Sequence, residues 1–300
     1  KIMKSIIIFG GSGYVGKNLI RSFAKHGHKI IVPHQKQINE ANLRLLGSIG
    51  QIVPLYFSSL KNPKILTLLN TVDVCINLKT SWDSKKSTLT KSIFNFNQDL
   101  VKIIKSSSSI KKFIFFSGLG VEKKLTFRNE IILKTEDLIS KELESSIILR
   151  SSVILGNGDL FLSSLKSFFK MSFFIPLFGD GSKKFQPVLV EDIEQFLNNA
   201  ILQPNIDKKL FELGGPETFT YKEFYSKIVE TMNKKRVFLP IPMPLVRAVV
   251  WFGEKIPFFP ITSEQLSLFD TDNLLNKEAS GFDYFKIVPK KIISAIEKSL

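Results

Sequence analysis

Short apolar runs alternate with amphipathic stretches along the first half of the chain. The apolar runs lie at residues 5–9, 29–32, 52–56, 72–78, 113–116 and 147–149. Most are apolar at every position, which is typical of strands covered on both faces of a sheet. Stretches with helical periodicity lie between them, at residues 14–25, 38–47, 63–69, 92–106 and 129–143. Strands separated by helices of this length predict an α/β fold with a doubly wound parallel sheet.

The pattern changes in the second half of the chain. It begins with an apolar, phenylalanine-rich stretch at residues 161–178. A helical stretch at 190–202, a strand at 210–213 and a second helical stretch at 220–232 follow. A proline-rich stretch at 239–261 and a final helix at 289–300 come last. We therefore expect two parts. Residues 1–156 and 186–215 would form the sheet domain, and residues 157–185 and 216–300 a smaller C-terminal lobe.

A glycine-rich loop follows the first predicted strand and leads directly into the first predicted helix. It comprises Gly10, Gly11, Ser12, Gly13, Tyr14, Val15 and Gly16. In this setting the first of three evenly spaced glycines permits a tight turn, the second lets backbone approach a pyrophosphate, and the third lets helix and strand pack closely. The helix N-terminus would add free N–H groups and its positive dipole end. The loop therefore predicts a dinucleotide site in a Rossmann domain, with a turn that binds no ligand as the alternative.

The residues after the second and fourth strands bear on which nucleotide is bound. An NAD site usually carries an acidic residue after the second strand, where it binds the ribose 2′-hydroxyl. This chain has His34, Gln35 and Lys36 there. Neutral or basic groups suit a 2′-phosphate, so the sequence favours NADP(H) over NAD(H), unless His34 and Lys36 are simply solvated. Leu78 and Lys79 follow the fourth strand and are expected to flank the cofactor.

Composition narrows the class of protein. Of 300 residues 44% are hydrophobic and 23% charged, as in an ordinary soluble globular protein. The net charge is +15, but only six of the 42 basic residues are arginines and the lysines are scattered, which argues against a nucleic-acid binder. The single cysteine cannot form an internal disulfide. His26, His28 and His34 have no carboxylate or cysteine partner nearby in sequence, so we interpret them as surface histidines and predict no metal site.

Several segments of the chain resemble a known family. The glycine spacing is that of the extended and atypical short-chain dehydrogenase/reductases. Further segments narrow the resemblance, at residues 46–53 (LGSIGQIV), 72–78 (VDVCINL), 113–119 (FIFFSGL), 185–192 (FQPVLVED), 211–220 (FELGGPETFT) and 260–266 (PITSEQL). Together they are similar to the nucleotide-binding accessory subunit family of respiratory complex I, the NADH:ubiquinone oxidoreductase alpha-subcomplex subunit nine family. The resemblance extends from about residue 4 to about residue 275.

This resemblance implies a Rossmann domain that holds NADP(H) or NAD(H), with a smaller lobe over the cleft. It implies other complex I subunits as partners and a peripheral position on the matrix or cytoplasmic side of the inner membrane. It also implies a structural or assembly role without turnover of the bound nucleotide. The family typically has an arginine after the second strand where this chain has Gln35, which weakens the preference for NADP(H).

The proton donor of active short-chain dehydrogenases is missing from the expected helix. These enzymes use a Tyr-x-x-x-Lys pair on the helix after the fifth strand, where the tyrosine exchanges a proton with substrate. The suitable lysine here is Lys134, and Glu130 stands four residues before it. Lys134 is predicted to hold the nicotinamide ribose, and Ser117 to line the nicotinamide side. The pattern favours binding without turnover, and an active oxidoreductase or epimerase with Glu130 as acid is the alternative.

The sequence leaves two alternatives open for the surface or protein that this chain contacts. Residues 237–261 combine many apolar and aromatic side chains with Arg247 and Lys255, which suits either a membrane interface or a core helix of the second lobe. Prolines and charges interrupt this stretch, so no segment is expected to span a bilayer. The resemblance favours contact with the membrane and complex I. A soluble redox sensor that reports the nucleotide ratio to another partner is the second alternative.

Overall fold

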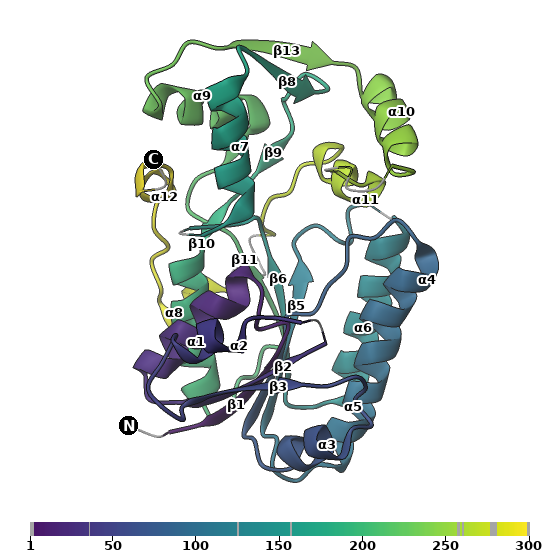
Figure 1. Cartoon of the computed structure of the whole chain (residues 1–300), viewed down its shortest axis with the longest axis vertical. Helices are drawn as coiled ribbons and strands as arrows, with labels where there is room; N and C mark the ends of the chain where they lie inside the picture. Colours follow the sequence, from purple (N-terminus) through teal and green to yellow (C-terminus); the bar gives the residue numbers. More distant parts are fainter. Residues whose placement is uncertain are drawn as a thin grey trace.

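A seven-stranded parallel sheet lies at the centre of the molecule (Figure 1). The computed structural model describes residues 3–35, 37–124, 126–156, 158–256, 259, 261–276 and 281–298. The strands lie in the order β11 (Leu210–Leu213), β6 (Ser146–Ser151), β5 (Lys112–Gly118), β4 (Val74–Asn77), β1 (Ser5–Phe9), β2 (Lys29–His34) and β3 (Ile52–Tyr56). The order of successive strands in the sheet reverses between β1 and β4, and this reversal opens a crevice at the carboxyl ends of the two strands. The predicted doubly wound α/β fold is confirmed.

Helices cover both faces of the sheet, as the uniformly apolar strands require. One face carries α1 (Tyr14–Lys25), α2 (Glu40–Arg44) and α8 (Val190–Leu202). The other carries α3 (Pro63–Leu69), α5 (Phe96–Ser106) and α6 (Phe127–Glu142). Successive side chains of β1 alternate between the two cores, because Ile6 and Ile8 pack in the first and Ile7 and Phe9 in the second. Burial on both faces explains why β1 shows no polar alternation.

The helix before the fifth strand is built in three pieces. The short helix α4 (Lys86–Leu89) continues through a π-helical turn, Thr90–Asn95, into α5. The predicted helix at 92–106 therefore starts several residues too late. Such π-turns widen a helix locally and are frequent at functional sites. Here the turn packs against α6 and borders the cavity described below, through Ile93.

A smaller lobe rises above the carboxyl ends of the strands (Figure 1). Its helices are α7 (Leu160–Met171), α9 (Tyr221–Thr231), α10 (Met243–Gly253), α11 (Ser263–Leu266) and α12 (Ile293–Lys298). Its short strands pair as β8 (Phe174–Phe178) with β13 (Val237–Ile241), β9 (Lys184–Phe185) with β12 (Phe219–Thr220), and β7 (Ile154–Leu155) with β10 (Val188–Leu189). Thr220 and Glu223 form a capping box that begins α9, which lies within the predicted helical stretch at 220–232.

The lobe has its own buried core, which contains only part of the phenylalanine-rich stretch. Phe169 is buried there, whereas Phe173 and Phe174 are more than half exposed. The last part of the chain divides between two cores. Phe282 and Ile287 pack with the sheet, although the expected division assigns them to the lobe, and Ile296 of α12 packs in the lobe. Among the described residues no helix is long and apolar enough to cross a bilayer.

Candidate nucleotide-binding site

The glycine loop makes the tight turn that the sequence predicts between β1 and α1. Gly10 has a φ of +77°, and its carbonyl accepts a hydrogen bond from the Gly13 N–H at 3.2 Å. A Cβ atom on Gly10 would lie 3.0 Å from the backbone of Leu78 and Lys79, at the end of β4. A Cβ atom on Gly16 would lie 2.4 Å from the Gly11 backbone. Strand, loop and helix are therefore packed too closely for side chains at these positions.

Gly13 differs from its neighbours, because nothing in the chain requires a glycine there. Its φ of −76° and ψ of 178° are open to any residue, and a Cβ atom would meet only the Gly10 carbonyl oxygen, at 3.5 Å. Gly13 is the N-cap of α1, yet no side chain caps this helix and its first turn carries no acidic residue. The first N–H groups of α1 are thus available to an anion in the space beside Gly13.

The carboxyl end of β2 carries the three residues predicted to meet the adenosine ribose. His34 is buried, and its Nε2 lies 2.9 Å from Oε1 of Glu40, whose Oε2 accepts from Arg44 at 2.8 Å. The interpretation of His34 as a solvated surface residue is therefore wrong, and His28 is buried as well. Gln35 is exposed at the strand end. Lys36 lies outside the described residues.

Lys79 joins the ends of β4 and β2. Its Nζ donates to Oε1 of Gln35 at 2.7 Å and lies 4.0 Å from the centre of the Phe96 ring. Burial, and then the charge of Lys91, lower the pKa of Lys79. The Lys79 backbone N–H donates to Asn77, which is fully buried. The structure thus brings Gln35 and Lys79, 44 positions apart, to one edge of the crevice.

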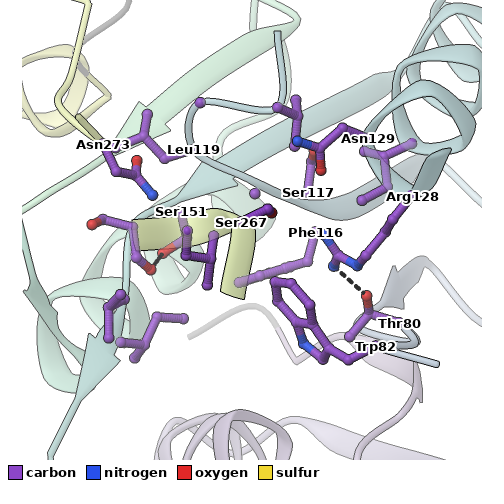
Figure 2. A pocket seen from close by; sticks show the side chains of 18 of the residues that line it. Thr80, Trp82, Phe116, Ser117, Leu119, Arg128, Asn129, Ser151, Ser267 and Asn273 are labelled. Atoms are coloured by element: carbon purple, nitrogen blue, oxygen red, sulfur yellow. Dashed lines mark hydrogen bonds between the residues drawn. The ribbon is translucent and has the colours of Figure 1, made fainter. Parts of the chain in front are cut away.

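A cavity of about 350 Å³ continues from the loop into the space between sheet and lobe. Tyr14, Val15, Leu78 and Lys79 line it at the loop end, and Ser117 lines it from the end of β5. The other end is lined by residues of the segment after β4, of α6 and of the lobe, among them Trp82, Arg128, Asn129, Ser267 and Asn273 (Figure 2). The cavity is therefore long enough to place a group beyond the nucleotide-binding loop.

Several polar atoms of the cavity wall lack a partner within the described part of the chain. They are the hydroxyl oxygens of Tyr14, Ser117 and Ser152, and Oδ1 of Asn273. Buried polar atoms are rarely left without a hydrogen bond, because each one costs free energy. Burial, reinforced by the charge of Asp159, raises the pKa of Tyr14 well above its usual range, so the hydroxyl stays protonated. A polar ligand would satisfy these atoms.

The face of α6 that lines the cavity carries Arg128, Asn129 and Ile132. Residues four apart share one face of a helix, so the pair that meets the cavity beside Ser117 is Arg128 and Ile132. Two anchors set this rotation of the helix. Ile139 is buried in the core against the sheet, and Glu136 receives hydrogen bonds from Arg150 of β6 at 3.1 and 2.7 Å.

Lys134, which the sequence predicts to hold the nicotinamide ribose, lies on a different face of α6. Lys134 does not line the cavity, and its Nζ lies 4.7 Å from the centre of the Phe94 ring instead. Glu130 is exposed and also outside the cavity wall. Glu130 and Lys134 are four residues apart and do share a face, but it is another face of α6. The pair four residues apart on the face of α6 that lines the cavity is Arg128 and Ile132.

Arg128 is held firmly inside the cavity (Figure 2). It is only 6% exposed, and its Nε and Nη2 donate to the Ser81 carbonyl and the Thr80 hydroxyl at 2.8 and 2.9 Å. Its guanidinium carbon lies 3.6 Å from the centre of the Trp82 ring. Burial lowers the pKa of Arg128 to about 10, although the charge of Glu264 acts in the opposite direction. Arg128 is therefore still a cation at neutral pH.

Comparison with known proteins is consistent with this geometry. Residues 6–131 match the NAD dependent epimerase/dehydratase family. Over 299 residues the chain is 26% identical to "NADH dehydrogenase [ubiquinone] 1 alpha subcomplex subunit 9, mitochondrial" of Arabidopsis thaliana, covering 95% of this chain and 74% of that protein. Over 290 residues it is 22% identical to the "NADH-ubiquinone oxidoreductase 40 kDa subunit, mitochondrial" of Neurospora crassa, covering 95% and 76%. The chain is therefore similar to these complex I subunits over most of its length.

The solved structures add the fold. The dTDP-glucose 4,6-dehydratase of Bacillus anthracis in complex with NAD has a TM-score of 0.74 at 13% identity, with 99% of this chain and 95% of that chain covered. At this identity the likeness shows a shared fold alone. The resemblance to the alpha-subcomplex subunit nine family is confirmed, and the chain has the same fold as this dehydratase.

Most residues of the inner cavity wall are not recognisable from the sequence. Arg128, Trp82 and Asn273 carry no motif, and Asn273 reaches the site from the far end of the chain. One signal was present for Arg128. A buried Glu136–Arg150 pair, recognised in the sequence, would have set the rotation of α6 and placed residues 128 and 132 toward Ser117.

Proposed function

We propose that this chain binds NADP(H) or NAD(H) at its glycine loop, turns over no substrate, and associates with respiratory complex I as an accessory subunit. The observation that carries the proposal is a contrast within one cavity. The loop is complete and Gly13 leaves open space, whereas Arg128 and Ile132, and not a tyrosine and a lysine, line the cavity from α6. The similar proteins of Arabidopsis and Neurospora, which are named as subunits of complex I, support the proposed partner.

Arg128 is a poor replacement for the tyrosine as a proton donor. With a pKa of about 10 it keeps its proton at neutral pH, and nothing comparable to the catalytic lysine lowers that value further, since Ile132 is apolar. Two of its nitrogens are already committed to Ser81 and Thr80. Glu130 would need an apolar cleft to act as an acid, but it is exposed. These features favour binding over turnover.

We further propose that the bound form is NADP(H). Glu40 is the acidic residue in contact with the end of β2, and His34 and Arg44 already occupy its two oxygens. It is therefore poorly placed to accept a ribose 2′-hydroxyl, as an NAD site requires. Lys79 places a positive charge beside Gln35, where a 2′-phosphate would lie. Calorimetry with NADPH and NADH would test this, and a tighter NADH complex would contradict it.

Turnover and partnership need separate measurements. Mass spectrometry of the nucleotide released from the purified protein should identify NADP(H). NADPH oxidation with a panel of aldehydes, ketones and quinones should stay at background. Turnover that disappears in Glu130→Gln would instead establish the oxidoreductase alternative. A native pull-down from membranes should recover complex I subunits, and recovery of a single soluble partner would favour the redox-sensor alternative.

We also propose a peripheral position on the inner membrane, on its matrix or cytoplasmic face. The observation that supports it is the outer surface of α10, where Leu245, Val249, Trp251 and Phe252 are each more than half exposed. Lys255 lies 3.6 Å from the centre of the Trp251 ring, which is a typical pairing at a headgroup interface. Figure 1 shows α10 on the lobe, far from α3 at the lower end of the sheet domain.

The membrane proposal has a direct test. Trp251 fluorescence should shift with anionic vesicles at low ionic strength and return with salt, because a single amphipathic contact is reversible. A Val249→Glu/Phe252→Glu variant should lose the shift without losing nucleotide binding. A wild-type protein with unchanged Trp251 fluorescence would refute the membrane contact and leave the nucleotide site untouched.

A further inference from the structure

The inner end of the cavity carries a positive charge that the nucleotide-binding role does not use. Arg128 is 6% exposed, and within the described residues it contacts a carbonyl, a hydroxyl and the Trp82 ring, all neutral. A buried cation is costly unless an anion accompanies it. Glu264 acts on Arg128 only at longer range, since no ion pair joins them within the described residues.

Among the other charged groups at this end, both cations are paired with Asp270, whereas the buried Oε2 of Glu264 has no hydrogen-bond partner among the described residues. Lys124 contacts Asp270, which also accepts from Arg247 at 2.8 Å. Asp272 lines the cavity and accepts from the Lys184 backbone N–H at 3.0 Å. Arg128 is therefore the cation at this end, among the described residues, that has no acidic hydrogen-bond partner. The site matches a single negative charge.

Hydrogen-bonding groups surround this cation without partners of their own. Nη1 of Arg128 makes no hydrogen bond within the described part of the chain, and neither does the buried hydroxyl of Ser117. Ser152 is 5% exposed and its hydroxyl is likewise without a partner there. Figure 2 shows Arg128, Ser117 and Asn129 converging on one region from α6 and β5. An acceptor placed among them would satisfy the donors together.

Part of the wall at this end is apolar, and this restricts the class of ligand. Ile93, Val121 and Ile132 line the same end with Trp82. Apolar walls with a few convergent polar groups are typical of small-molecule sites. A planar guanidinium with one remaining edge suits a carboxylate, which accepts hydrogen bonds in its plane. A dianionic phosphate would meet only one such cation and would leave apolar surface uncovered.

We infer that the inner end of the cavity binds a small monocarboxylate with an apolar body, held by Arg128 and Ser117 beside the nucleotide. This inference rests on the proposed function in one respect, that the nucleotide occupies the loop end and leaves the inner end open. The carboxylate is a bound ligand, and no chemical step is assigned to it. Arg128 thus provides an anion-binding group on the face of α6 that lines the cavity.

Benzoate and benzamide make a matched probe pair, because they differ in charge and hardly in shape. Wild-type protein loaded with NADPH should bind benzoate at least about 10-fold more tightly than benzamide, by calorimetry and by quenching of Trp82 in a Trp251→Phe background. Arg128→Gln keeps a donor for Thr80 and should weaken benzoate at least about 10-fold. Lys134→Gln removes a cation from the same helix outside the cavity, and should leave benzoate binding unchanged.

Each outcome decides for or against the site. Equal binding of benzoate and benzamide, or unchanged benzoate binding in Arg128→Gln, would overturn it. Tighter binding of inorganic phosphate than of benzoate would overturn the carboxylate class. If Arg128→Gln does not fold, the comparison of benzoate with benzamide on wild-type protein decides alone. A separate NADPH titration distinguishes the two proposals, because nucleotide binding without benzoate binding refutes only this one, and the reverse refutes the proposed function.

Discussion

Replacing Gly13 with valine separates nucleotide binding from folding. The backbone at Gly13 suits any residue, and the nearest atom to a Cβ is the Gly10 carbonyl oxygen at 3.5 Å. The stability cost should therefore be limited to the poorer N-cap, about 1 kcal/mol, which corresponds to about 2–4 °C in Tm. The valine methyl groups would occupy the space through which a pyrophosphate approaches the start of α1.

The loss of affinity can be worked from the hydrogen bonds at stake. A hydrogen bond to a charged group contributes about 1.5–3 kcal/mol, so the loss of one phosphate contact should weaken binding about 10- to 150-fold. Calorimetry with NADPH measures this directly, and differential scanning fluorimetry records the Tm. Gly13→Ala, with a smaller side chain, should show a smaller loss in affinity and almost no change in Tm.

Gly16→Ala is the matched control, because it alters the same loop but should reduce stability more than nucleotide affinity. Its Cβ would lie 2.4 Å from the Gly11 backbone, so the loop or helix must shift and the protein should lose about 1–3 kcal/mol or more in stability. Its nucleotide affinity would fall only as far as the loop is distorted. Unchanged NADPH affinity in Gly13→Val, with the fold intact, would refute the placement of the pyrophosphate at this loop.

Three further predictions concern the nucleotide class, a buried network and a titrating group. Lys79→Gln should weaken NADPH binding about 10-fold and leave NADH almost unchanged, and an equal loss for both nucleotides in calorimetry would contradict its role at the 2′-phosphate. Arg150→Met leaves the buried carboxylates of Glu136 and Glu212 without their cation, so urea unfolding should show a loss of about 3–5 kcal/mol. Burial, and then the neighbouring Glu191, raise the pKa of Glu194 to about 7, whereas the unfolded group titrates at 4.5. The folded state binds this proton more tightly, so its contribution to stability is lost as pH rises from about 4.5 to about 7. Glu194→Gln should accordingly raise Tm relative to wild type at pH 8 and match it near pH 4.5, and an equal Tm difference at both pH values would argue against this titration.

The strands of the sheet and the glycine loop could be predicted from the sequence, because both depend on residues that are close together in the chain. An apolar run of four to six residues forms a buried strand wherever it pairs, and the turn at Gly10 follows from residues within one loop of it. The order of strands and the position of the crevice then follow from the handedness and length of the connections. This is why the nucleotide end of the cavity, from Gly10 to Gly16 with Leu78 and Lys79, was predictable.

Tertiary packing determines which face of α6 lines the cavity and which distant residues, such as Asn273, complete the cavity wall. The spacing of four residues is satisfied by Glu130 with Lys134 and equally by Arg128 with Ile132, so sequence spacing could not choose between them. The choice depends on the rotation of the helix, which is set by contacts with β6 through Glu136. Asn273 lines the same cavity although it follows Arg128 by 145 positions in the chain, so no local sequence pattern could place it there. Long-range packing therefore fixes the chemistry of the inner cavity, whereas short-range sequence pattern fixes the glycine loop.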